Sequence, residues 1–332
     1  MKEQEIRPKE LFEEYLEISK NDIKTFFSDS DSFVSINCPA CCSENISSAF
    51  IKHGFKYIQC DDCFTLFTSP RPTEDMISKF YKNSMSGKFW AERFFPETAE
   101  ARREKIFKPR VDLLENIISN LELPEPKSLV DVGAGFGIFL EEVNKRKLFH
   151  KTYGVEPSVD LAKTCREKGI NVIEKAVGEI DENELRASIA TSFEVFEHLF
   201  NPEEFINNMK NIIKPNGIIL FTTLTISGLD LLVLGKNSKS ISPPHHINFF
   251  SIEGLRILMD RCELEIVEIN TPGKLDIDII INMMHENPQV DIPDFIKYIY
   301  KHRSDDLYNN FQTFLQQNNL SSHVCVIARK NS

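Results

Sequence analysis

The sequence lacks any long apolar stretch and any excess of positive charge. No apolar run approaches the roughly 18 residues that a membrane-spanning helix requires, and the charged segment Met1 to Glu10 carries no apolar core of a signal peptide. Acidic residues outnumber basic ones by 50 to 39, giving a net charge of -11, which argues against a dedicated nucleic-acid binder. We therefore expect a soluble, cytoplasmic protein without a membrane span, and nucleic acid is not an expected partner.

Cysteine is scarce outside one short segment. Five of the eight cysteines fall between Cys38 and Cys63, and in a reducing compartment such clustering indicates a metal site rather than disulfides. The other three, Cys165, Cys262 and Cys325, stand alone in the sequence. They are most simply explained as small buried residues.

The clustered cysteines form two C-x-x-C knuckles separated by eighteen residues. Two such knuckles offer four thiolates, which is a ligand set for tetrahedral zinc. The predicted ligands are Cys38, Cys41, Cys60 and Cys63. Cys42 neighbours a ligand and is expected to point elsewhere. Because four cysteines close the coordination sphere, we expect the zinc of this ribbon to be structural.

The chain divides into four segments by its patterns. Helical spacing predicts a helical segment over residues 1–30, which is followed by the ribbon over 31–72 and a helical connector over 73–125. From 126 to 332, short apolar runs alternate with helical stretches, which indicates an α/β domain with a parallel sheet. A helical insertion at about 272–320 is expected to form a lid or a subunit contact in a homo-oligomer.

The largely apolar run Ser128 to Val132 predicts a buried strand, a glycine-rich turn follows it, and helical spacing resumes directly after the turn. Such a strand-turn-helix lets the backbone approach a ligand closely at the edge of a sheet. The G-x-G-x-G spacing and a preceding acid differ from the G-x-G-x-x-G turn of dinucleotide enzymes. In the next strand, Glu156 occupies the end, where a carboxylate can accept hydrogen bonds from both hydroxyls of a ribose. The residues of the turn are Asp131, Gly133, Ala134, Gly135 and Gly137.

Together these motifs resemble class I S-adenosylmethionine-dependent methyltransferases. The acidic glycine turn matches the first motif of that family, and Glu156 matches its ribose-binding acid. Ser192 to Leu199, which includes Phe193 and Glu194, matches the fourth-strand segment, and Lys214 to Gly217 matches the turn into the fifth strand. The resemblance implies a Rossmann-like seven-stranded sheet, S-adenosylmethionine as cofactor, and these residues as its binding site.

Histidines supply the candidates for a catalytic base. Methyl transfer can require a base that removes the acceptor's proton, and histidine suits that role near neutral pH. His198 follows the fourth strand, while His245 and His246 lie in a loop after the fifth-strand segment. His198 can also be explained as a capping or packing residue. Tyr81 is a further candidate, although an aromatic residue beside Phe80 can equally serve packing.

The order of ribbon, connector, core and histidine loop is similar to nucleotide-sugar C-methyltransferases and to methyltransferases of surface-polysaccharide pathways. The resemblance implies that Tyr81 and one of His245 and His246 contact the acceptor. It favours a small-molecule acceptor that is a sugar, a nucleotide-sugar or a glycoconjugate precursor. The basic run Arg102 to Arg110 could bind phosphate on such an acceptor. Alternatively, it forms a solvated helix face that is paired with Glu97, Glu100 and Glu104.

Two alternative functions have to be weighed against methylation of a small molecule. An RNA methyltransferase could grip nucleic acid with the zinc ribbon, but the acidic charge and the lack of an Asn-Pro-Pro-Tyr motif argue against it. A non-catalytic binding protein could retain the same fold. The intact glycine turn, followed by Glu156, argues against that alternative.

Overall fold

The computed structural model describes residues 2–331 and contains two compact units. Unit 1 comprises the chain up to Ala99, Leu224–Leu255 and Asn270–Val324. Unit 2 comprises Glu100–Thr223, Arg256–Ile269 and the chain from Cys325. Each unit therefore combines segments that are distant in the sequence. Among the described residues, no helix combines the length and the apolar character that crossing a membrane requires.

Unit 2 is built on a seven-stranded sheet with the strand order β10-β11-β8-β7-β4-β5-β6. Strand β4 pairs in parallel with β5 and β7, and the pairs β5–β6 and β7–β8 are also parallel. This sheet confirms the predicted Rossmann-like α/β fold class. The strands are β4 (Ser128–Val132), β5 (Lys151–Val155), β6 (Val172–Ile173), β7 (Ala187–Phe193), β8 (Ile213–Leu224), β10 (Leu264–Asn270) and β11 (His323–Lys330).

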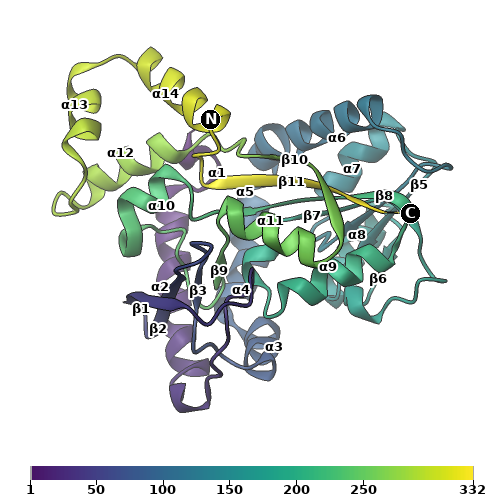
Figure 1. Ribbon diagram of the computed structural model, residues 1–332, viewed down its shortest axis with the longest axis horizontal. Coiled ribbons are helices and arrows are strands. Elements are labelled where there is room, and N and C mark those ends of the chain that lie inside the picture. The colour runs from purple at the N-terminus through teal and green to yellow at the C-terminus, as the bar shows by residue number, and fades with distance from the viewer. Residues whose placement is uncertain (1, 332) are drawn as a thin grey trace. The chain divides into compact units, whose positions relative to one another are not determined.

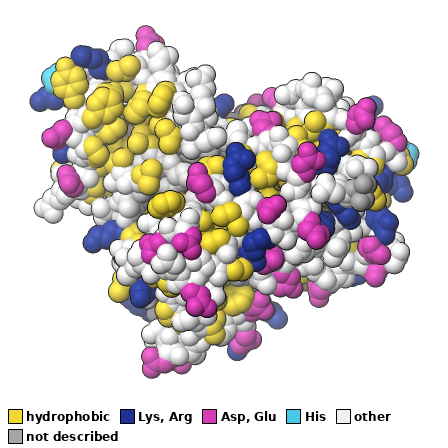
Figure 2. All heavy atoms as spheres, in the orientation of Figure 1, with side chains coloured by type: hydrophobic (Ala, Val, Ile, Leu, Met, Phe, Trp, Pro, Cys, Tyr) yellow, Lys and Arg dark blue, Asp and Glu magenta, His cyan; other side chains and the backbone are white. Residues whose placement is uncertain are grey.

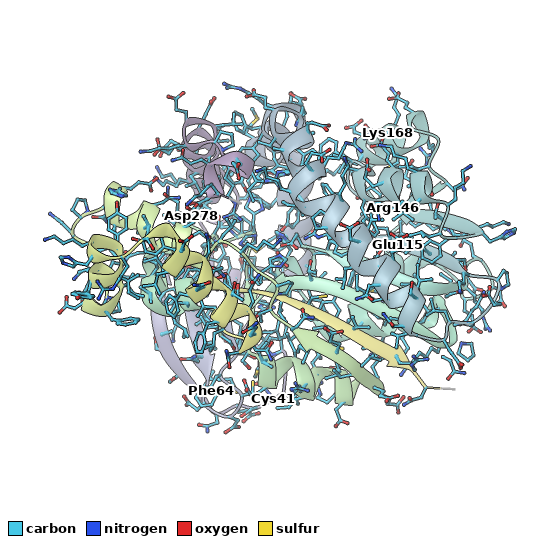
Figure 3. All side chains as sticks on the ribbon, turned by 90° about the horizontal axis from the view of Figure 1, so that it is seen from above. Cys41, Phe64, Glu115, Arg146, Lys168 and Asp278 are labelled. Carbon is cyan, nitrogen blue, oxygen red and sulfur yellow. The ribbon has the colours of Figure 1, made fainter. Side chains whose placement is uncertain are left out.

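Helices cover this sheet, with α6 and α7 on one side and α9 on the other (Figure 1). Arg146 of α7 pairs with Asp112 and Glu115 of α6, each at 2.5 Å (Figure 3). Leu129 of β4 and Phe139 of α7 are buried in the core of this unit. The helices are α6 (Lys108–Asn120), α7 (Ile138–Arg146), α8 (Val159–Glu167), α9 (Pro202–Asn211) and α11 (Ile252–Arg261).

The predicted turn before the fifth strand lies within the first residues of β8. Ala187 pairs with Ile213, whereas Ile189 pairs with Ile218, so the register shifts between these two pairs. The extra residues of β8 hold the predicted turn, and Asn216 has a φ of 60°. The difference from the prediction is therefore a bulge that lets the strand begin earlier.

A four-stranded sheet in the order β1-β2-β3-β9 forms the ribbon of unit 1. All of its pairs are antiparallel. The first three strands come from the predicted ribbon, but the fourth comes from a segment far along the chain. The strands are β1 (Ile46–Lys52), β2 (Phe55–Cys60), β3 (Leu66–Thr68) and β9 (Asn248–Phe249). The two cysteine knuckles lie at the end of the ribbon that Figure 3 marks with Cys41 and Phe64.

Helices from the N-terminal segment and the connector pack together in unit 1. The long helix α2 (Lys9–Phe26) buries Leu11, Phe12 and Tyr15 in a cluster with Phe94. The Asp22 carboxylate accepts hydrogen bonds from the amides at the start of α4, at 3.2 and 2.7 Å. The other elements here are α1 (Glu3–Ile6), α3 (Glu74–Asn83), α4 (Met85–Phe89), a π-helical segment (Trp90–Phe94) and α10 (Leu229–Leu234); α5 (Phe95–Arg102) and a second π-helical segment (Arg103–Phe107) lead into α6.

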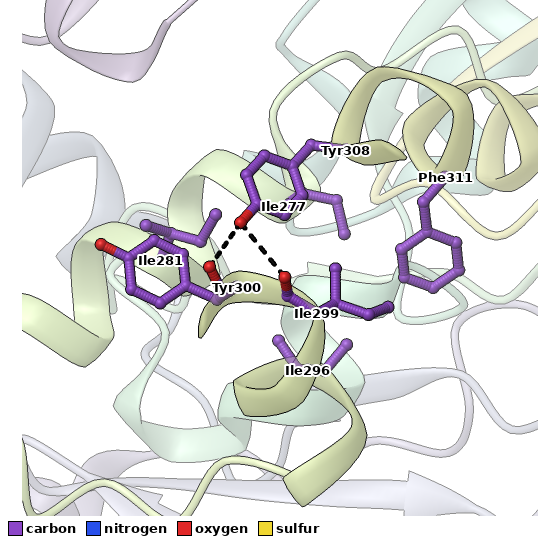
Figure 4. A pocket seen from close by; sticks show the side chains of 7 residues that line it. All are labelled: Ile277, Ile281, Ile296, Ile299, Tyr300, Tyr308 and Phe311. Carbon is purple, nitrogen blue, oxygen red and sulfur yellow. Dashed lines mark hydrogen bonds between the residues drawn. The ribbon is translucent and has the colours of Figure 1, made fainter. Parts of the chain in front are cut away.

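The insertion forms three helices, α12 (Asp276–Glu286), α13 (Asp294–His302) and α14 (Asp305–Gln317). A small apolar pocket lies between them, and the Tyr308 hydroxyl donates to the carbonyl of Tyr300 beside it at 2.7 Å (Figure 4). On the outer side of α13 and α14, exposed hydrophobic side chains gather (Figure 2). They include Phe295, Tyr298 and Phe314, each at least half exposed.

Candidate functional site

The glycine-rich turn directly follows β4. Gly135 has a φ of 55°, and a Cβ placed there would meet no atom within 4 Å. Gly137 has a φ of 71°, and a Cβ there would lie 2.5 Å from the side chain of Ile170. Left-handed backbone favours glycine at both positions. The turn is therefore closed by packing at Gly137, while at Gly135 the backbone faces space that a ligand can occupy.

Glu156 follows β5 and turns its carboxylate toward the glycine turn. The amide of Gly135 donates to Oε2 at 2.9 Å, and the amide of Ser158 donates to Oε1 at 2.9 Å. Burial raises the pKa of Glu156, and the two backbone hydrogen bonds oppose that shift. Because each carboxylate oxygen can accept more than one hydrogen bond, Glu156 keeps acceptor capacity for the hydroxyls of a ligand.

Asp131 lies within β4, directly before the turn, and is only 3% exposed. The Thr191 hydroxyl donates to its Oδ1 at 2.7 Å. Burial raises the pKa of Asp131 to about 7, although the hydrogen bond from Thr191 and the charge of Arg110 lower it. A positive charge on a ligand nearby would favour the ionised form of this carboxyl.

Phe193 and Glu194, at the end of β7, are held by Arg110. The Arg110 Nη2 lies 2.6 Å from Glu194 Oε1, and the guanidinium carbon lies 4.4 Å from the centre of the Phe193 ring. Thr222 also donates to Glu194 Oε1 at 2.6 Å. The sequence alone does not reveal this role of Arg110, because Glu194 is 84 residues away along the chain. No local pattern could have identified the pair.

The basic run that includes Arg110 is engaged in ion pairs. Arg103 pairs with Glu100 at 3.4 Å and also with Glu141 and Glu142 of α7. Lys108 pairs with Glu104. These contacts favour the alternative in which the run forms a charge-paired helix face. The charges of these side chains are thus already compensated within unit 2.

His198 ends the short 3₁₀ turn Phe196–His198 of unit 2 and is partly buried. Its amide donates to the carbonyl of Val195 at 3.0 Å. The neighbouring Glu197 is 1% exposed and accepts a hydrogen bond from the Thr223 hydroxyl at 2.8 Å. This carboxylate fixes the turn that carries His198.

In unit 1, the structure brings Tyr81 and His245 together. Their ring centres lie 5.8 Å apart, and Phe80 lies 5.0 Å from the same imidazole. His245 is 8% exposed, whereas Tyr81 is 45% exposed. Tyr15 of α2 completes the group at 6.0 Å. Tyr15 could not be identified from the sequence, because its spacing on the helix is that of an ordinary packing residue.

His246 has a defined ring orientation. Its Nδ1 lies 2.6 Å from the carbonyl oxygen of Ser240. Since a carbonyl oxygen can only accept, Nδ1 is the donor in this contact. The Tyr57 hydroxyl donates to the backbone carbonyl of His246 at 2.7 Å. Both the ring and the backbone of His246 are therefore held in place.

The four predicted cysteine ligands converge. Their sulfur atoms all lie within 4.8 Å of one another, and the pairs Cys38–Cys63 and Cys41–Cys60 are each 3.5 Å apart. A tetrahedral zinc ion with Zn–S bonds of about 2.3 Å separates its sulfurs by about 3.8 Å, so this donor set fits zinc. Cys42 is exposed and does not belong to the cluster. The isolated Cys165, Cys262 and Cys325 are buried, as predicted.

Parts of this chain are similar to known proteins in sequence or in fold. The ubiquinone biosynthesis O-methyltransferase of Rickettsia prowazekii (strain Madrid E) is 30% identical over 117 residues, which cover 34% of this chain and 46% of that protein. The enzyme of the same name from Shewanella halifaxensis (strain HAW-EB4) is 29% identical over 153 residues, which cover 42% of this chain and 63% of that protein. The chain spans about half the length of the curated relatives it matches, down to 37% for the mitochondrial enzyme of Dictyostelium discoideum. A SAM-dependent methyltransferase from Archaeoglobus fulgidus is 18% identical with a TM-score of 0.48, over 72% of this chain and 100% of that one.

A family model described as a methyltransferase domain matches residues 99–269. The matched range contains the glycine turn, Glu156 and the ends of β7 and β8. It also covers more than half of the chain. The chain therefore belongs to the methyltransferase-domain family, as the order of its motifs predicted.

Proposed function

We propose that this protein transfers a methyl group from S-adenosylmethionine to a small-molecule acceptor. The observation that carries the proposal is the hydrogen bond from the Gly135 amide to the Glu156 carboxylate. It joins the glycine turn to the end of β5 in a methyltransferase domain. When bound, the donor supplies an electrophilic methyl group on a sulfonium ion. The residues of the chain have to orient the donor and to prepare the acceptor.

The residues of the donor site contact different chemical groups of S-adenosylmethionine. Glu156 accepts hydrogen bonds from the ribose hydroxyls, while the backbone of the turn approaches the donor on the open side of Gly135. Asp131 balances the donor's positive charge from its buried position. The other predicted donor residues shape the turn and the end of β7; they are Gly133, Ala134, Gly137, Phe193 and Glu194.

Three side chains are candidates for work on the acceptor. His246 is the preferred base, because the hydrogen bond between Nδ1 and the Ser240 carbonyl and the one from Tyr57 to its backbone hold the imidazole in one orientation. Tyr81 offers an exposed hydroxyl beside His245, and His198 follows the end of β7.

The four cysteines hold a zinc ion whose role is structural, because no coordination position is left for a reactant.

For the acceptor, we propose a sugar, nucleotide-sugar or glycoconjugate precursor of the kind used in polysaccharide biosynthesis. The support for this acceptor is the resemblance, in the order of ribbon, connector, core and histidine loop, to nucleotide-sugar C-methyltransferases. The compensated charges of Arg103, Lys108 and Arg110 limit their use for a phosphate or for nucleic acid.

A second candidate is a phenolic hydroxyl on an aromatic ring. It is favoured by the names of the ubiquinone-pathway relatives and by Tyr81, the exposed ring of the aromatic group around His245, on which a flat acceptor could stack. An acceptor with a flat apolar ring would gain more from this group than a hydrated sugar would.

An acceptor screen tests the proposal and separates the two classes. The protein is incubated with methyl-labelled S-adenosylmethionine and either a panel of nucleotide-sugars or a panel of phenols. Formation of S-adenosylhomocysteine and of labelled product is then measured. Turnover in the first panel supports a sugar acceptor, and turnover in the second supports a phenol. A protein that binds S-adenosylhomocysteine but labels neither class, nor RNA, would favour the non-catalytic alternative.

A further inference from the structure

The ribbon and the histidine loop share one sheet. Strand β9 begins two residues after His246 and pairs with β3, so that Phe67 lies opposite Asn248 and Leu66 lies opposite Phe249. The amide of Thr68 donates to the carbonyl of Ile247 at 3.0 Å. The backbone directly after the histidines is therefore the edge strand of the ribbon.

Two buried side chains of the ribbon reinforce this connection. The Tyr57 hydroxyl donates to the carbonyl of His246 at 2.7 Å. The Arg71 guanidinium donates from Nη2 to Asn248 Oδ1 at 2.9 Å and from Nε to the carbonyl of Thr68 at 3.0 Å. Tyr57 and Arg71 are both fully buried. The bond from Arg71 to Asn248 is thus fully buried, and the bond from Tyr57 to His246 is partly buried.

The cysteine knuckles are linked to the same segment. The Ser251 hydroxyl donates to the carbonyl of Cys63, and the Ser251 amide donates to the Thr65 hydroxyl at 3.4 Å. A zinc ion bound by the four thiolates would order the knuckle backbone, because metal binding at such a site is coupled to its folding. Metal at the knuckles would therefore hold the backbone of Cys63 and Thr65 that Ser251 contacts.

We propose that the metal-bound ribbon is the device that positions His246, with Tyr57 and Arg71 as positioning residues. The inference rests on the proposed function, in which His246 acts on the acceptor. Loss of the metal releases the segment from His245 to Phe250, because β9 loses the ordered strand against which it pairs. The hydrogen bonds described for Gly135, Glu156 and Asp131 join residues of unit 2, so we expect donor binding to persist.

A matched pair of substitutions tests the positioning role. Tyr57→Phe and Tyr308→Phe each remove a hydroxyl that donates to a backbone carbonyl of unit 1 at 2.7 Å. In Tyr57→Phe, we expect hydrogen exchange of the amides from His246 to Phe250 to accelerate about fivefold, as the loss of one hydrogen bond implies. Tyr308→Phe should leave these amides unchanged. Equal protection of the loop in both variants would overturn the proposal.

Metal extraction from the unmodified full-length protein gives a second test, which does not depend on how a variant folds. After treatment with a chelator, exchange of the same loop amides should increase at least about tenfold, and restoring zinc should reverse the change. Calorimetry with S-adenosylhomocysteine is run on both samples. If the donor product binds but loop exchange does not respond to the metal, the positioning role is wrong. If it binds neither sample, the proposed function fails instead.

Discussion

The donor site of unit 2 and the histidine loop of unit 1 are constructed in opposite ways. The donor site is local, since Gly135 and Glu156 are 21 residues apart and follow adjacent parallel strands. The loop is held from afar, because Tyr57 reaches His246 across 189 residues and Arg71 reaches Asn248 across 177. The central contact of the first kind of site is made by residues that follow neighbouring strands of one sheet. A site of the second kind depends on a separate part of the chain, here the ribbon. We infer that metal bound to the ribbon keeps the histidine loop in place.

The largest effect should come from breaking the metal site. Cys60→Ser removes one of the four thiolates, and a structural zinc ion contributes about 10 kcal/mol or more to folding. We expect this variant to lose its zinc and the cooperative unfolding of unit 1, as measured by elemental analysis and thermal unfolding. Cys42→Ser is the matched control, because Cys42 is exposed and outside the cluster. Equal zinc content in both variants would contradict the assigned ligand set.

Removing the base should affect turnover but not the donor. In His246→Ala, we expect turnover to fall by about 100-fold or more, since the proton acceptor is lost, while the affinity for S-adenosylhomocysteine stays within about twofold. His285→Ala, which removes an imidazole from the helical insertion, is the control and should retain full turnover. A fully active His246→Ala enzyme would return this residue to a packing role.

The donor turn can be tested with two glycines of similar geometry. Gly135 and Gly54 both have a positive φ, and at neither position would an added Cβ meet an atom within 4 Å. Alanine at either position costs about 1 kcal/mol or more of backbone strain, so thermal unfolding should shift similarly. Only Gly135→Ala should weaken binding of S-adenosylhomocysteine, by about tenfold or more, because its methyl group enters the donor's space. Equal affinities in the two variants would place the donor elsewhere.

The same contrast explains what the sequence could predict. The parallel sheet, the glycine turn and Glu156 follow from short-range patterns, because a strand, a tight turn and a helix each leave a local signature. The four cysteines were also predictable from their spacing. The contacts of Tyr15 with His245 and of Arg110 with Glu194 were not, because they join residues whose local patterns indicate only packing or a charged helix face. Nor does any sequence pattern reveal that β9 completes the ribbon.

A smaller effect is expected from pH. Burial raises the pKa of Asp131 to about 7, and the positively charged donor favours its ionised form. Affinity for S-adenosylmethionine should therefore rise with pH up to about 7 and level off above it, by at most about tenfold per pH unit. In the unliganded protein, stability changes with pH in the opposite direction. Because the folded protein holds the Asp131 proton more tightly than the unfolded chain does, the free energy of unfolding decreases as pH rises from about 4 to 7. Asp131→Asn should flatten the binding profile, and calorimetry at several pH values checks this.

The most direct test of the donor site is calorimetric titration of S-adenosylhomocysteine into the wild-type protein and into Glu156→Ala. Glu174→Ala, which loses an ion pair with Arg166, serves as the control in the same unit. We predict saturable binding with one site per chain in the wild type and the control, and an affinity at least about 100-fold weaker in Glu156→Ala, as expected when two ribose hydrogen bonds to a charged group are lost. Absence of binding in the wild type, or unchanged affinity in Glu156→Ala, would contradict the assignment of the donor site.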